Sequence, residues 1–330
     1  MPRVSVVLCS YNQRAYLPEA VESVLGQTYG DYELLVLDNG STDGSRELLA
    51  RYEGDPRVRL FLHDQNAAVS RRMNEGVRDA RGEFISFLYS DDMYLPTKLE
   101  RQVERFASLG PEWGVVYSYV QGLNQKTGQR WRFPSIAAEG DVFADLLARH
   151  DRGPVDMLTP LTRRACFERF PFYEDVFAEG EAVFFRLAQA YKFAFLPEPL
   201  AVYRDTGENR GKALVRNAEM VFDLLERLER GPDSTPAHAR AVGDFRRLYN
   251  RRLGWQAVRL DGDMGWARRR FHDALRLSWR DLFHPYVLLG YPLSLTPTPL
   301  RKAINRAGFA VRKKPETLAI RDSYGGSAPG

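Results

Sequence analysis

The sequence predicts an α/β fold in which a mostly parallel sheet is flanked by helices and followed by a helical extension at the carboxyl end. Through the first 110 positions, short apolar runs alternate with helical patterns of roughly ten residues. Strands that alternate with helices are joined by right-handed crossovers, which produce a parallel sheet covered on both faces. Beyond about residue 210 the pattern changes to successive helices.

Four continuous apolar runs predict buried strands, and they lie at residues 4–9, 33–37, 57–62 and 83–88. Apolar residues at helical spacing predict helices from about residue 17 to 25, up to about residue 52, and from 70 to 80. Pro96 suits the start of a further helix over residues 97–107. An acidic stretch at residues 174–181 opens another apolar helix at 182–190.

Polar residues follow three of the four predicted strands, at the point where each strand ends. They are Ser10, Asn12, Asp38, Asp43, Asp91 and Asp92. The carboxyl ends of parallel strands meet at one edge of a sheet, and open α/β sheets bind their ligands there. We therefore expect these side chains to form one site.

Asp91 is a candidate ligand for a divalent metal because it ends an apolar run that should be buried. A carboxylate in that position needs a cation or a solvent-filled cleft to offset its desolvation. Mg2+ and Mn2+ bind carboxylate oxygens together with substrate phosphates, so one or two carboxylates suffice. The alternative interpretation is a solvated turn that leads into the helix after Pro96.

A polar cluster of this composition fits a nucleoside diphosphate. Asp38 can accept a hydrogen bond from a base imide or a ribose hydroxyl, and Asn39 with Gly40 forms the tight turn that lets the backbone approach. The alternative role for Asp38 is an Asx turn that caps its own loop. The sequence contains neither the glycine fingerprint of dinucleotide-binding folds nor a Walker phosphate loop, so metal is the available means of holding phosphates.

Three segments in this order, residues 4–12, 36–44 and 82–92, resemble the family 2 glycosyltransferases of the GT-A type. Residues 66–74, read as Asn-x-x-Val-Ser-Arg-x-x-Asn, resemble the family's stretch between the third and fourth strands. The resemblance covers roughly residues 3–205. It implies a Rossmann-like GT-A fold and an inverting transfer of a sugar from a nucleotide-diphospho-sugar, with Mn2+ or Mg2+ as cofactor.

The resemblance also implies roles for individual residues. Asp38 would bind the base or ribose, and Asp91 would hold the metal with Asp92 beside it. The remaining residues that it assigns to the nucleotide site are Ser10, Tyr11, Asn12, Asn66, Arg71 and Ser90.

The chain departs from the family pattern near the metal site. Tyr89 stands where the family often has the first acid of its Asp-x-Asp-Asp motif. The family often has a histidine after a Tyr-Arg pair, as a further metal or phosphate contact, whereas Arg204 is followed here by Asp205 and Thr206. Either oxygen side chain can replace the histidine, and we take Asp205 as the candidate metal ligand. Arg204 itself can contact the diphosphate as a bidentate donor, or be a surface arginine without a role.

The catalytic base is predicted within the acidic stretch before residue 182. Inverting transfer requires a carboxylate that accepts the proton of the acceptor hydroxyl. Alignment by the Arg-Leu-Ala at residues 186–188 places Gly180 where the family has its usual aspartate. Glu179 is then the first candidate, and Glu181 or Asp175 the alternatives. Acids in a first helical turn also complement the helix dipole without any catalytic purpose.

The composition bounds the domain organisation and the compartment. A chain of 330 residues suggests a catalytic domain at 1–210 and a helical, basic region at 211–330 with a disordered tail. Cys9 and Cys166 are expected to stay reduced, as in the cytoplasm, and five scattered histidines argue against zinc. We expect no cleavable signal, and no stretch of about 18 apolar residues predicts a membrane span.

The carboxyl-terminal region is basic. Residues 246–280 hold ten Arg or Lys against three acids, and an aromatic and aliphatic segment follows at 282–291. This pattern predicts peripheral attachment to an anionic membrane. The alternative is a set of helices packed on the catalytic domain with a solvated basic face. Nucleic acid is not an expected partner, because no recognised motif accompanies the charge.

Taken together, the sequence predicts an inverting, metal-dependent hexosyltransferase of polysaccharide or cell-envelope biosynthesis. Its expected donor is UDP-linked, and its acceptor a glycan or lipid-linked hydroxyl, selected by loops at residues 117–132 and 154–159. A non-catalytic nucleotide-sugar-binding scaffold is the alternative, because Tyr89 and Gly180 replace family acids. A nucleotidyltransferase is a weaker alternative, since residues 10–14 do not form its glycine-rich basic loop.

Overall fold

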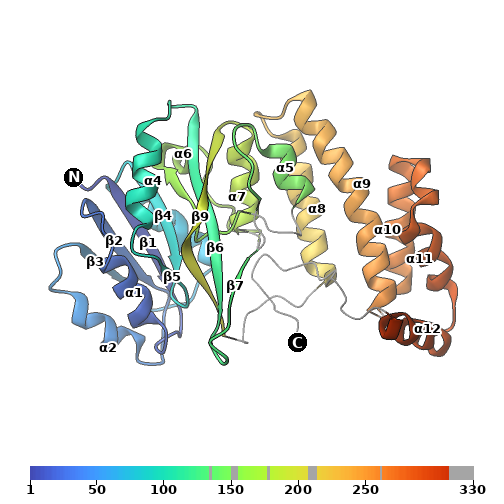
Figure 1. Ribbon diagram of the computed structural model, residues 1–330, viewed down its shortest axis with the longest axis horizontal. Coiled ribbons are helices and arrows are strands. Elements are labelled where there is room, and N and C mark those ends of the chain that lie inside the picture. Colours follow the sequence, from blue (N-terminus) through green and yellow to red (C-terminus); the bar gives the residue numbers. More distant parts are fainter. Residues whose placement is uncertain (134–135, 150–154, 177–178, 207–213, 261, 312–330) are drawn as a thin grey trace. The chain divides into compact units, whose positions relative to one another are not determined.

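The computed structural model describes residues 1–311 except 134–135, 150–154, 177–178, 207–213 and 261, and helix ends near these gaps are described by backbone alone. These residues form two compact units, one up to residue 212 and one from 213 onward (Figure 1). The domain boundary predicted at residue 210 and the predicted disordered tail both lie outside the described residues.

The first unit contains strands and helices in alternation. In chain order its elements are β1 (Val4–Ser10), α1 (Leu17–Leu25), β2 (Tyr32–Asp38), α2 (Ser45–Leu49), η1 (Ala50–Tyr52), β3 (Val58–Leu62), α3 (Val69–Asp79), β4 (Phe84–Tyr89), β5 (Met93–Tyr94), α4 (Lys98–Ala107), β6 (Trp113–Asn124), β7 (Arg130–Arg132), α5 (Phe143–Ala148), β8 (Leu161–Arg163), α6 (Arg164–Arg169), α7 (Glu179–Ala188) and β9 (Lys192–Asp205). The four strands predicted from apolar runs are confirmed within one residue at either end.

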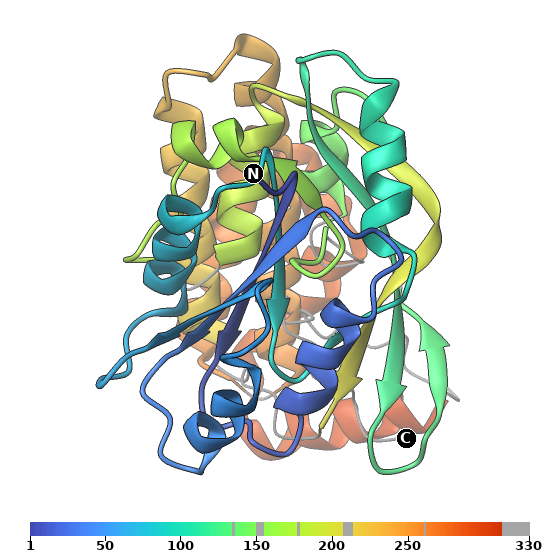
Figure 2. The ribbon, with the colours of Figure 1, turned by 90° about the vertical axis from the view of Figure 1, so that its left-hand side faces the viewer.

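The described strands form one sheet in the order β3-β2-β1-β4-β8-β6-β9-β5, with β7 paired to β6 (Figure 2). Strands β3, β2, β1 and β4 are parallel, as predicted. The other half is mixed, because β8 pairs antiparallel with both β4 and β6 while β6 and β9 are parallel. The parallel arrangement predicted for the four strands before residue 90 is therefore confirmed, and the later strands add a mixed half that contains the parallel pair β6–β9.

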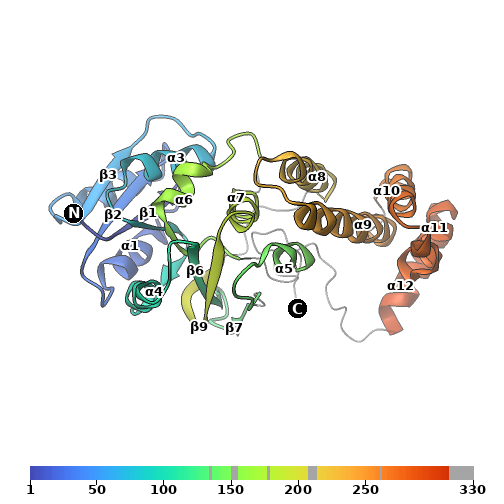
Figure 3. The same ribbon diagram turned by 90° about the horizontal axis from the view of Figure 1, so that it is seen from above.

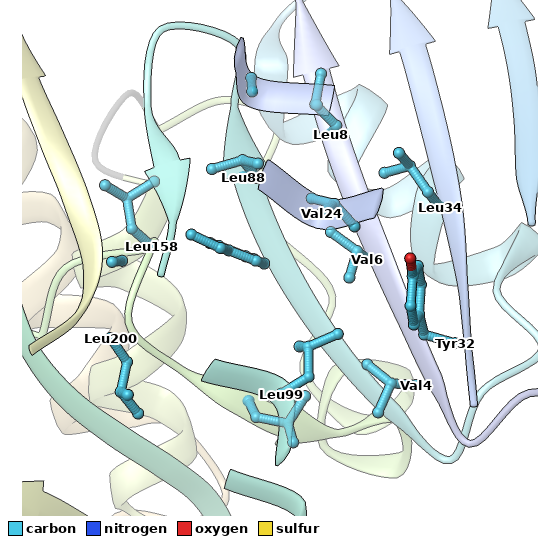
Figure 4. Close-up of a cluster of buried hydrophobic side chains, with 14 of the residues drawn as sticks. Val4, Val6, Leu8, Val24, Tyr32, Leu34, Leu88, Leu99, Leu158 and Leu200 are labelled. Atoms are coloured by element: carbon cyan, nitrogen blue, oxygen red, sulfur yellow. The ribbon is translucent and has the colours of Figure 1, made fainter. Parts of the chain in front are cut away.

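Helices cover both faces of this sheet and bury its apolar side chains. Helices α1 and α4 lie on one face, and α3 and α6 on the other (Figure 3). Every residue of β1 and β2 is buried, and Val6, Leu34 and Leu88 belong to one apolar cluster with Val24 of α1 (Figure 4). Each such side chain contributes about 1.5–3 kcal/mol by leaving water. This core holds the strand ends rigidly in place.

The strand register brings the polar residues to one edge. Ser10 lies opposite Asp38 in the β1–β2 pair, and Cys9 lies opposite Tyr89 in the β1–β4 pair. The ends of these three strands are therefore level with one another. The expected gathering of polar residues after the strands follows from this register.

The second unit is helical. Its elements are α8 (Leu214–Arg230), α9 (Pro236–Arg259), α10 (Met264–Leu277), η2 (Trp279–Phe283), α11 (Pro285–Leu295) and α12 (Thr298–Val311). The sequence predicts helices over about residues 212–230, 237–260 and 265–277, and α8, α9 and α10 agree with these bounds within about two residues. The sequence did not predict α11 and α12 as helices. Helix α11 has apolar residues on all sides and Pro292 in its interior, so it lacks the usual periodic signal. None of the described helices is both long and apolar enough to cross a membrane.

Candidate functional site

Two buried polar groups stand side by side at the ends of β1 and β2. Asp38 Oδ1 accepts hydrogen bonds from the Ser41 amide at 3.0 Å and from Arg46 Nε at 3.3 Å. Asp38 Oδ2 and Ser10 Oγ have no hydrogen-bond partner among the described residues, although both are buried. A buried polar atom without a partner is unfavourable by about 1–3 kcal/mol, which a ligand donor at Asp38 would relieve.

The loops after β1 and β2 are tied to each other. Asn12 Oδ1 accepts from the Thr42 amide at 2.8 Å, and the Asn12 amide donates to Ser41 Oγ at 2.9 Å. Asn12 has a φ of 52°, a left-handed conformation that asparagine tolerates better than most residues. The Arg14 amide donates to Asp43 Oδ2 at 2.9 Å. Asn12 and Asp43 therefore shape the loops around Asp38, and Tyr11, which directly precedes Asn12 in the chain, is half-buried.

Asn39 joins the loop after β2 to the loop before α3. Its Oδ1 accepts from Arg72 Nε at 2.7 Å and from the Ala67 amide at 3.0 Å, and its Nδ2 donates to Asn66 Oδ1 at 2.6 Å. Asn66 is thus brought to the site as predicted for its segment. Arg71 is exposed on the first turn of α3, whereas the next residue, Arg72, is buried and holds Asn39. The motif has its arginine at residue 71, and Arg72 falls at one of its variable positions, so the sequence did not single it out.

At the end of β4 the two aspartates have different surroundings. Asp92 is buried, and its Oδ1 accepts from the Arg204 amide at 2.8 Å. Burial and the neighbouring Asp91 carboxylate raise the pKa of Asp92 well above its usual range. Asp91 is partly exposed, and burial of its carboxyl raises its pKa, with the Arg204 guanidinium opposing the shift. Ser90, also buried, donates its amide to the Cys9 carbonyl at 3.2 Å.

The guanidinium of Arg204 is buried and bonded to protein groups. Its Nε donates to the main-chain oxygen of Asp91 at 2.9 Å, and Nη1 donates to Gln125 Oε1 at 2.7 Å. Its Nη2 forms a 2.5 Å ion pair with Glu19 Oε2 of α1. This geometry favours a role in positioning the turn at Asp91 over the predicted contact with a diphosphate.

The carboxylates of four aspartates act electrostatically on the phenol of Tyr203. Burial raises the pKa of this phenol, and Asp92, Asp156, Asp91 and Asp205 add to the shift in that order. Asp205 is buried at the end of β9, where its Oδ2 accepts from Asn124 Nδ2 at 3.4 Å. The acidic residues predicted after β4 and β9 therefore lie in one electrostatic neighbourhood.

The fit to a metal rests on Asp91. In the described segments, no three His, Cys, Asp or Glu side chains form a group that could hold a metal ion. A site completed by substrate phosphates needs only one or two carboxylates. A cation would offset the desolvation that disfavours the charged form of Asp91, which is partly open to solvent. The donor set thus fits Mg2+ or Mn2+ bound together with a diphosphate.

Asp156 is a residue of this neighbourhood that sequence reasoning did not single out. Burial raises its pKa to about 6, and its Oδ1 accepts from the Leu158 amide at 3.0 Å. Gln102 of α4 holds the same turn, because its Nε2 donates to the carbonyls of Thr159 at 2.6 Å and Val116 at 3.0 Å. The only sequence signal was the position of this turn within a predicted acceptor loop.

The predicted base region lies at the start of α7. The side chains of Glu179 and Glu181 lie outside the part of the chain that the structure describes, and Asp175 is exposed in the preceding loop. Asn74 of α3 fixes this loop, with its Oδ1 accepting from the Phe172 amide at 2.8 Å and its Nδ2 donating to Glu174 Oε1 at 3.1 Å.

Gly180 is closely covered by Met157. A Cβ added to Gly180 would lie 2.7 Å from Met157 Cγ, so an aspartate there would require Met157 to move. The glycine that replaces the family's aspartate at residue 180 therefore leaves space that the Met157 side chain occupies. Met157 follows Asp156 directly, so the Asp156 turn reaches the first turn of α7.

The sequence is similar to known glycosyltransferases. Residues 5–173 match the glycosyl transferase family 2. An uncharacterised glycosyltransferase of Nostoc sp. (strain PCC 7120) is 36% identical over 298 residues, which cover 88% of this chain and 89% of that protein. TuaG of Bacillus subtilis, provisionally named a teichuronic acid biosynthesis glycosyltransferase, is 38% identical over 104 residues. That match covers 31% of this chain and 41% of TuaG, so the chain spans less than half of this relative.

Two solved structures share the fold. S. aureus TarS 1-349 in complex with UDP-GlcNAc has a TM-score of 0.56 at 15% identity, over 85% of this chain and 92% of that one. The mannosyltransferase PcManGT from Pyrobaculum calidifontis, in complex with GDP-Man and Mn2+, has a TM-score of 0.59 at 17% identity, over 93% and 87%. The predicted GT-A fold is confirmed, and the protein belongs to glycosyl transferase family 2.

Proposed function

We propose that this glycosyltransferase transfers a sugar from a nucleotide-diphospho-sugar to a hydroxyl of a glycan, polysaccharide or lipid-linked acceptor. The transfer inverts the configuration at the anomeric carbon of the sugar. The observation that carries the proposal is the pair of unpartnered buried atoms, Asp38 Oδ2 and Ser10 Oγ, at the sheet edge that also holds Asp91. The UDP-GlcNAc bound by TarS and the GDP-Man and Mn2+ bound by PcManGT support it.

In this proposal the nucleotide binds at the ends of β1 and β2. Asp38 Oδ2 accepts a hydrogen bond from the base imide or a ribose hydroxyl, and the Ser10 hydroxyl bonds a second polar group of the nucleotide. Asn12 and Asn39 keep the flanking loops in place through the contacts described above. We take UDP as the nucleotide, with GDP as the alternative to be distinguished by binding.

Asp91 would hold a divalent metal together with the diphosphate of the donor. When bound, Mn2+ or Mg2+ supplies positive charge that stabilises the departing diphosphate. Arg204 holds the main chain of Asp91, and Asp92 holds the main chain of Arg204, so both position the metal ligand. Asp205 at the end of β9 is the further candidate for a metal ligand. Its carboxylate acts on the phenol of Tyr203, as the Asp91 carboxylate does.

The transfer is a single displacement at the anomeric carbon. The acceptor oxygen forms a bond to that carbon while the bond to the diphosphate oxygen breaks, which inverts the configuration. The hydroxyl proton passes to a carboxylate, for which we propose Glu179, the first residue of α7. Glu181 and Asp175 remain the alternatives from the same segment.

Nucleotide binding is tested by a thermal-shift screen of the full chain with UDP, GDP and other nucleoside diphosphates, with and without Mn2+. UDP with Mn2+ is expected to raise the melting temperature most, because a ligand at 100 times its Kd stabilises the folded state by about 2.7 kcal/mol. Asp38→Asn should lose most of this ligand-induced shift.

Asp31→Asn is the matched control, because Asp31 is exposed and directly precedes β2, whereas Asp38 ends this strand. It should keep the full shift. A shift that survives in Asp38→Asn would remove Asp38 from the nucleotide site, and the absence of any shift with every nucleotide would contradict the proposed function.

A further inference from the structure

Exposed apolar side chains are concentrated in η2, α11 and α12 of the second unit, and we name this set the outer apolar face. Its members are Trp279, Leu282, Phe283, Pro285, Leu288, Leu289, Pro292, Leu295, Leu300 and Ile304. Phe283 is 68% exposed, Leu288 56% and Leu295 64%. Most of the exposed large apolar side chains in the described residues belong to this face. Exposed apolar side chains that gather in this way mark sites of interaction.

Helix α11 is oriented by its inner side, which packs against its own bundle. Val287, Gly290 and Ser294 are buried, and a Cβ on Gly290 would lie 2.6 Å from Phe271 Cζ of α10. The rings of Tyr286 and Trp255 stack at 5.6 Å. These contacts direct the opposite side of α11 away from α9 and α10.

That opposite side is apolar, contrary to the usual pattern of a water-facing helix. Leu288, Pro292 and Leu295 recur at helical spacing along it, and Pro285 and Leu289 widen the stripe. No charged residue occurs in residues 285–295. Helices at the surface of globular proteins normally expose charged or polar residues on this side. The outer apolar face is therefore built for an apolar environment.

Positive charge flanks the outer apolar face. Residues 279–306 contain four basic residues and one acidic residue, Asp281. Asp281 is buried, and its Oδ1 accepts from Arg251 at 2.9 Å and Arg247 at 3.3 Å. The exposed ionic residues on either side of α11 are the cations Arg280, Lys302 and Arg306.

The arginines of α9 and α10 have a different role from the one predicted for residues 246–280. Arg246 pairs with Glu229 at 2.9 Å, and Arg270 pairs with Asp273 at 2.9 Å. Arg247 and Arg251 meet at Asp281. Arg246, Arg247, Arg251 and Arg270 are thus paired with acids of the bundle, so the cations considered below are those of the segment that forms the outer apolar face.

We propose that the outer apolar face lies in the interfacial region of an anionic lipid bilayer, with Arg280, Lys302 and Arg306 at the level of the headgroups. Apolar side chains buried at the headgroup boundary and cations near anionic lipids are the two contributions that hold interfacial helices. A two-fold symmetric dimer through this face is less favourable than a lipid surface. It would place the cations of both copies near one another, and this segment has no exposed acid to pair with them. The proposal is independent of the nucleotide site.

The experiment measures sedimentation of the full chain with vesicles of phosphatidylcholine alone or with about one third phosphatidylglycerol. The wild type is expected to bind the anionic vesicles, and less so at high salt. The triple change Leu288→Gln, Leu289→Gln and Leu295→Gln should lower the partition coefficient at least about tenfold, since several buried methylene groups are lost. All three side chains are exposed, and a circular dichroism melt confirms folding.

A second variant tests the charge. Arg280→Gln with Lys302→Gln and Arg306→Gln should reduce binding about fivefold per cation and remove the preference for anionic lipid. Leu62→Gln, an exposed leucine of the first unit, is the control and should bind as the wild type does. Wild-type protein that ignores anionic vesicles at low salt, or that forms a dimer through this face without vesicle binding, would overturn the proposal.

Discussion

Asp91→Ala is expected to abolish the Mn2+-dependent part of UDP binding while leaving the fold intact. The Asp91 side chain is partly exposed, and the contact that joins this residue to Arg204 uses its main-chain oxygen. An alanine keeps that oxygen, so the turn at the end of β4 should persist. Titration calorimetry with UDP, in the presence and absence of Mn2+, measures the effect, and a thermal melt checks the fold.

Asp92→Asn is the matched comparison for Asp91→Ala. The asparagine keeps an oxygen that can accept from the Arg204 amide, so it preserves the contact that ties β9 to the end of β4. We expect Mn2+-dependent binding to survive in Asp92→Asn. Equal loss in both variants would make both aspartates metal ligands, and unchanged Mn2+ dependence in Asp91→Ala would remove Asp91 from the site.

Glu179→Gln is expected to lower the transfer rate at least about 100-fold with nearly unchanged nucleotide affinity. Glutamine has almost the size of glutamate and still forms hydrogen bonds, but it cannot take the proton of the acceptor hydroxyl. The rate is measured as transfer to an acceptor at saturating donor, and UDP affinity is measured separately by calorimetry.

Three matched exchanges locate the base. Glu181→Gln, Asp175→Asn and Asp156→Asn should each reduce transfer much less than Glu179→Gln. Asp156 is included because its pKa, raised to about 6, leaves it ionised at neutral pH beside the Asp92 carboxyl. A collapse of transfer in one of these variants, with Glu179→Gln close to full activity, would move the role to that carboxylate.

The first half of the fold was predictable because its signals are local. Strands β1, β2 and β4 are continuous apolar runs, and their polar ends follow in the sequence. Strand β9 lacked such a signal, since Pro197 and Pro199 interrupt it and proline is unusual within a sheet. They fall where the pairing of β6 with β9 shifts register, which is where a strand tolerates them. The mixed half of the sheet could not be read from local pattern.

The candidate site shows the same division. The positions of Asp38 and Asp91 at one edge of the sheet were predictable, because Asp38 ends one apolar strand and Asp91 closely follows another. The ion pair of Arg204 with Glu19 was not predictable, because Glu19 lies in α1, far from Arg204 in the sequence. Asp156 reaches the neighbourhood of Asp92 through a turn held by Gln102 of α4. Side chains that depend on tertiary contacts of this kind carry no sequence signal of their own.

The central claim is metal-dependent sugar transfer, and the most direct measurement is turnover of a broad panel of UDP- and GDP-linked sugars by the full chain. Released nucleoside diphosphate is followed with Mn2+, with Mg2+ and with chelator. We predict turnover of at least one donor that requires the metal and is lost in Asp91→Ala. Tight, Mn2+-dependent binding of UDP without turnover of any donor in the panel would contradict the account and favour a non-catalytic nucleotide-sugar-binding scaffold.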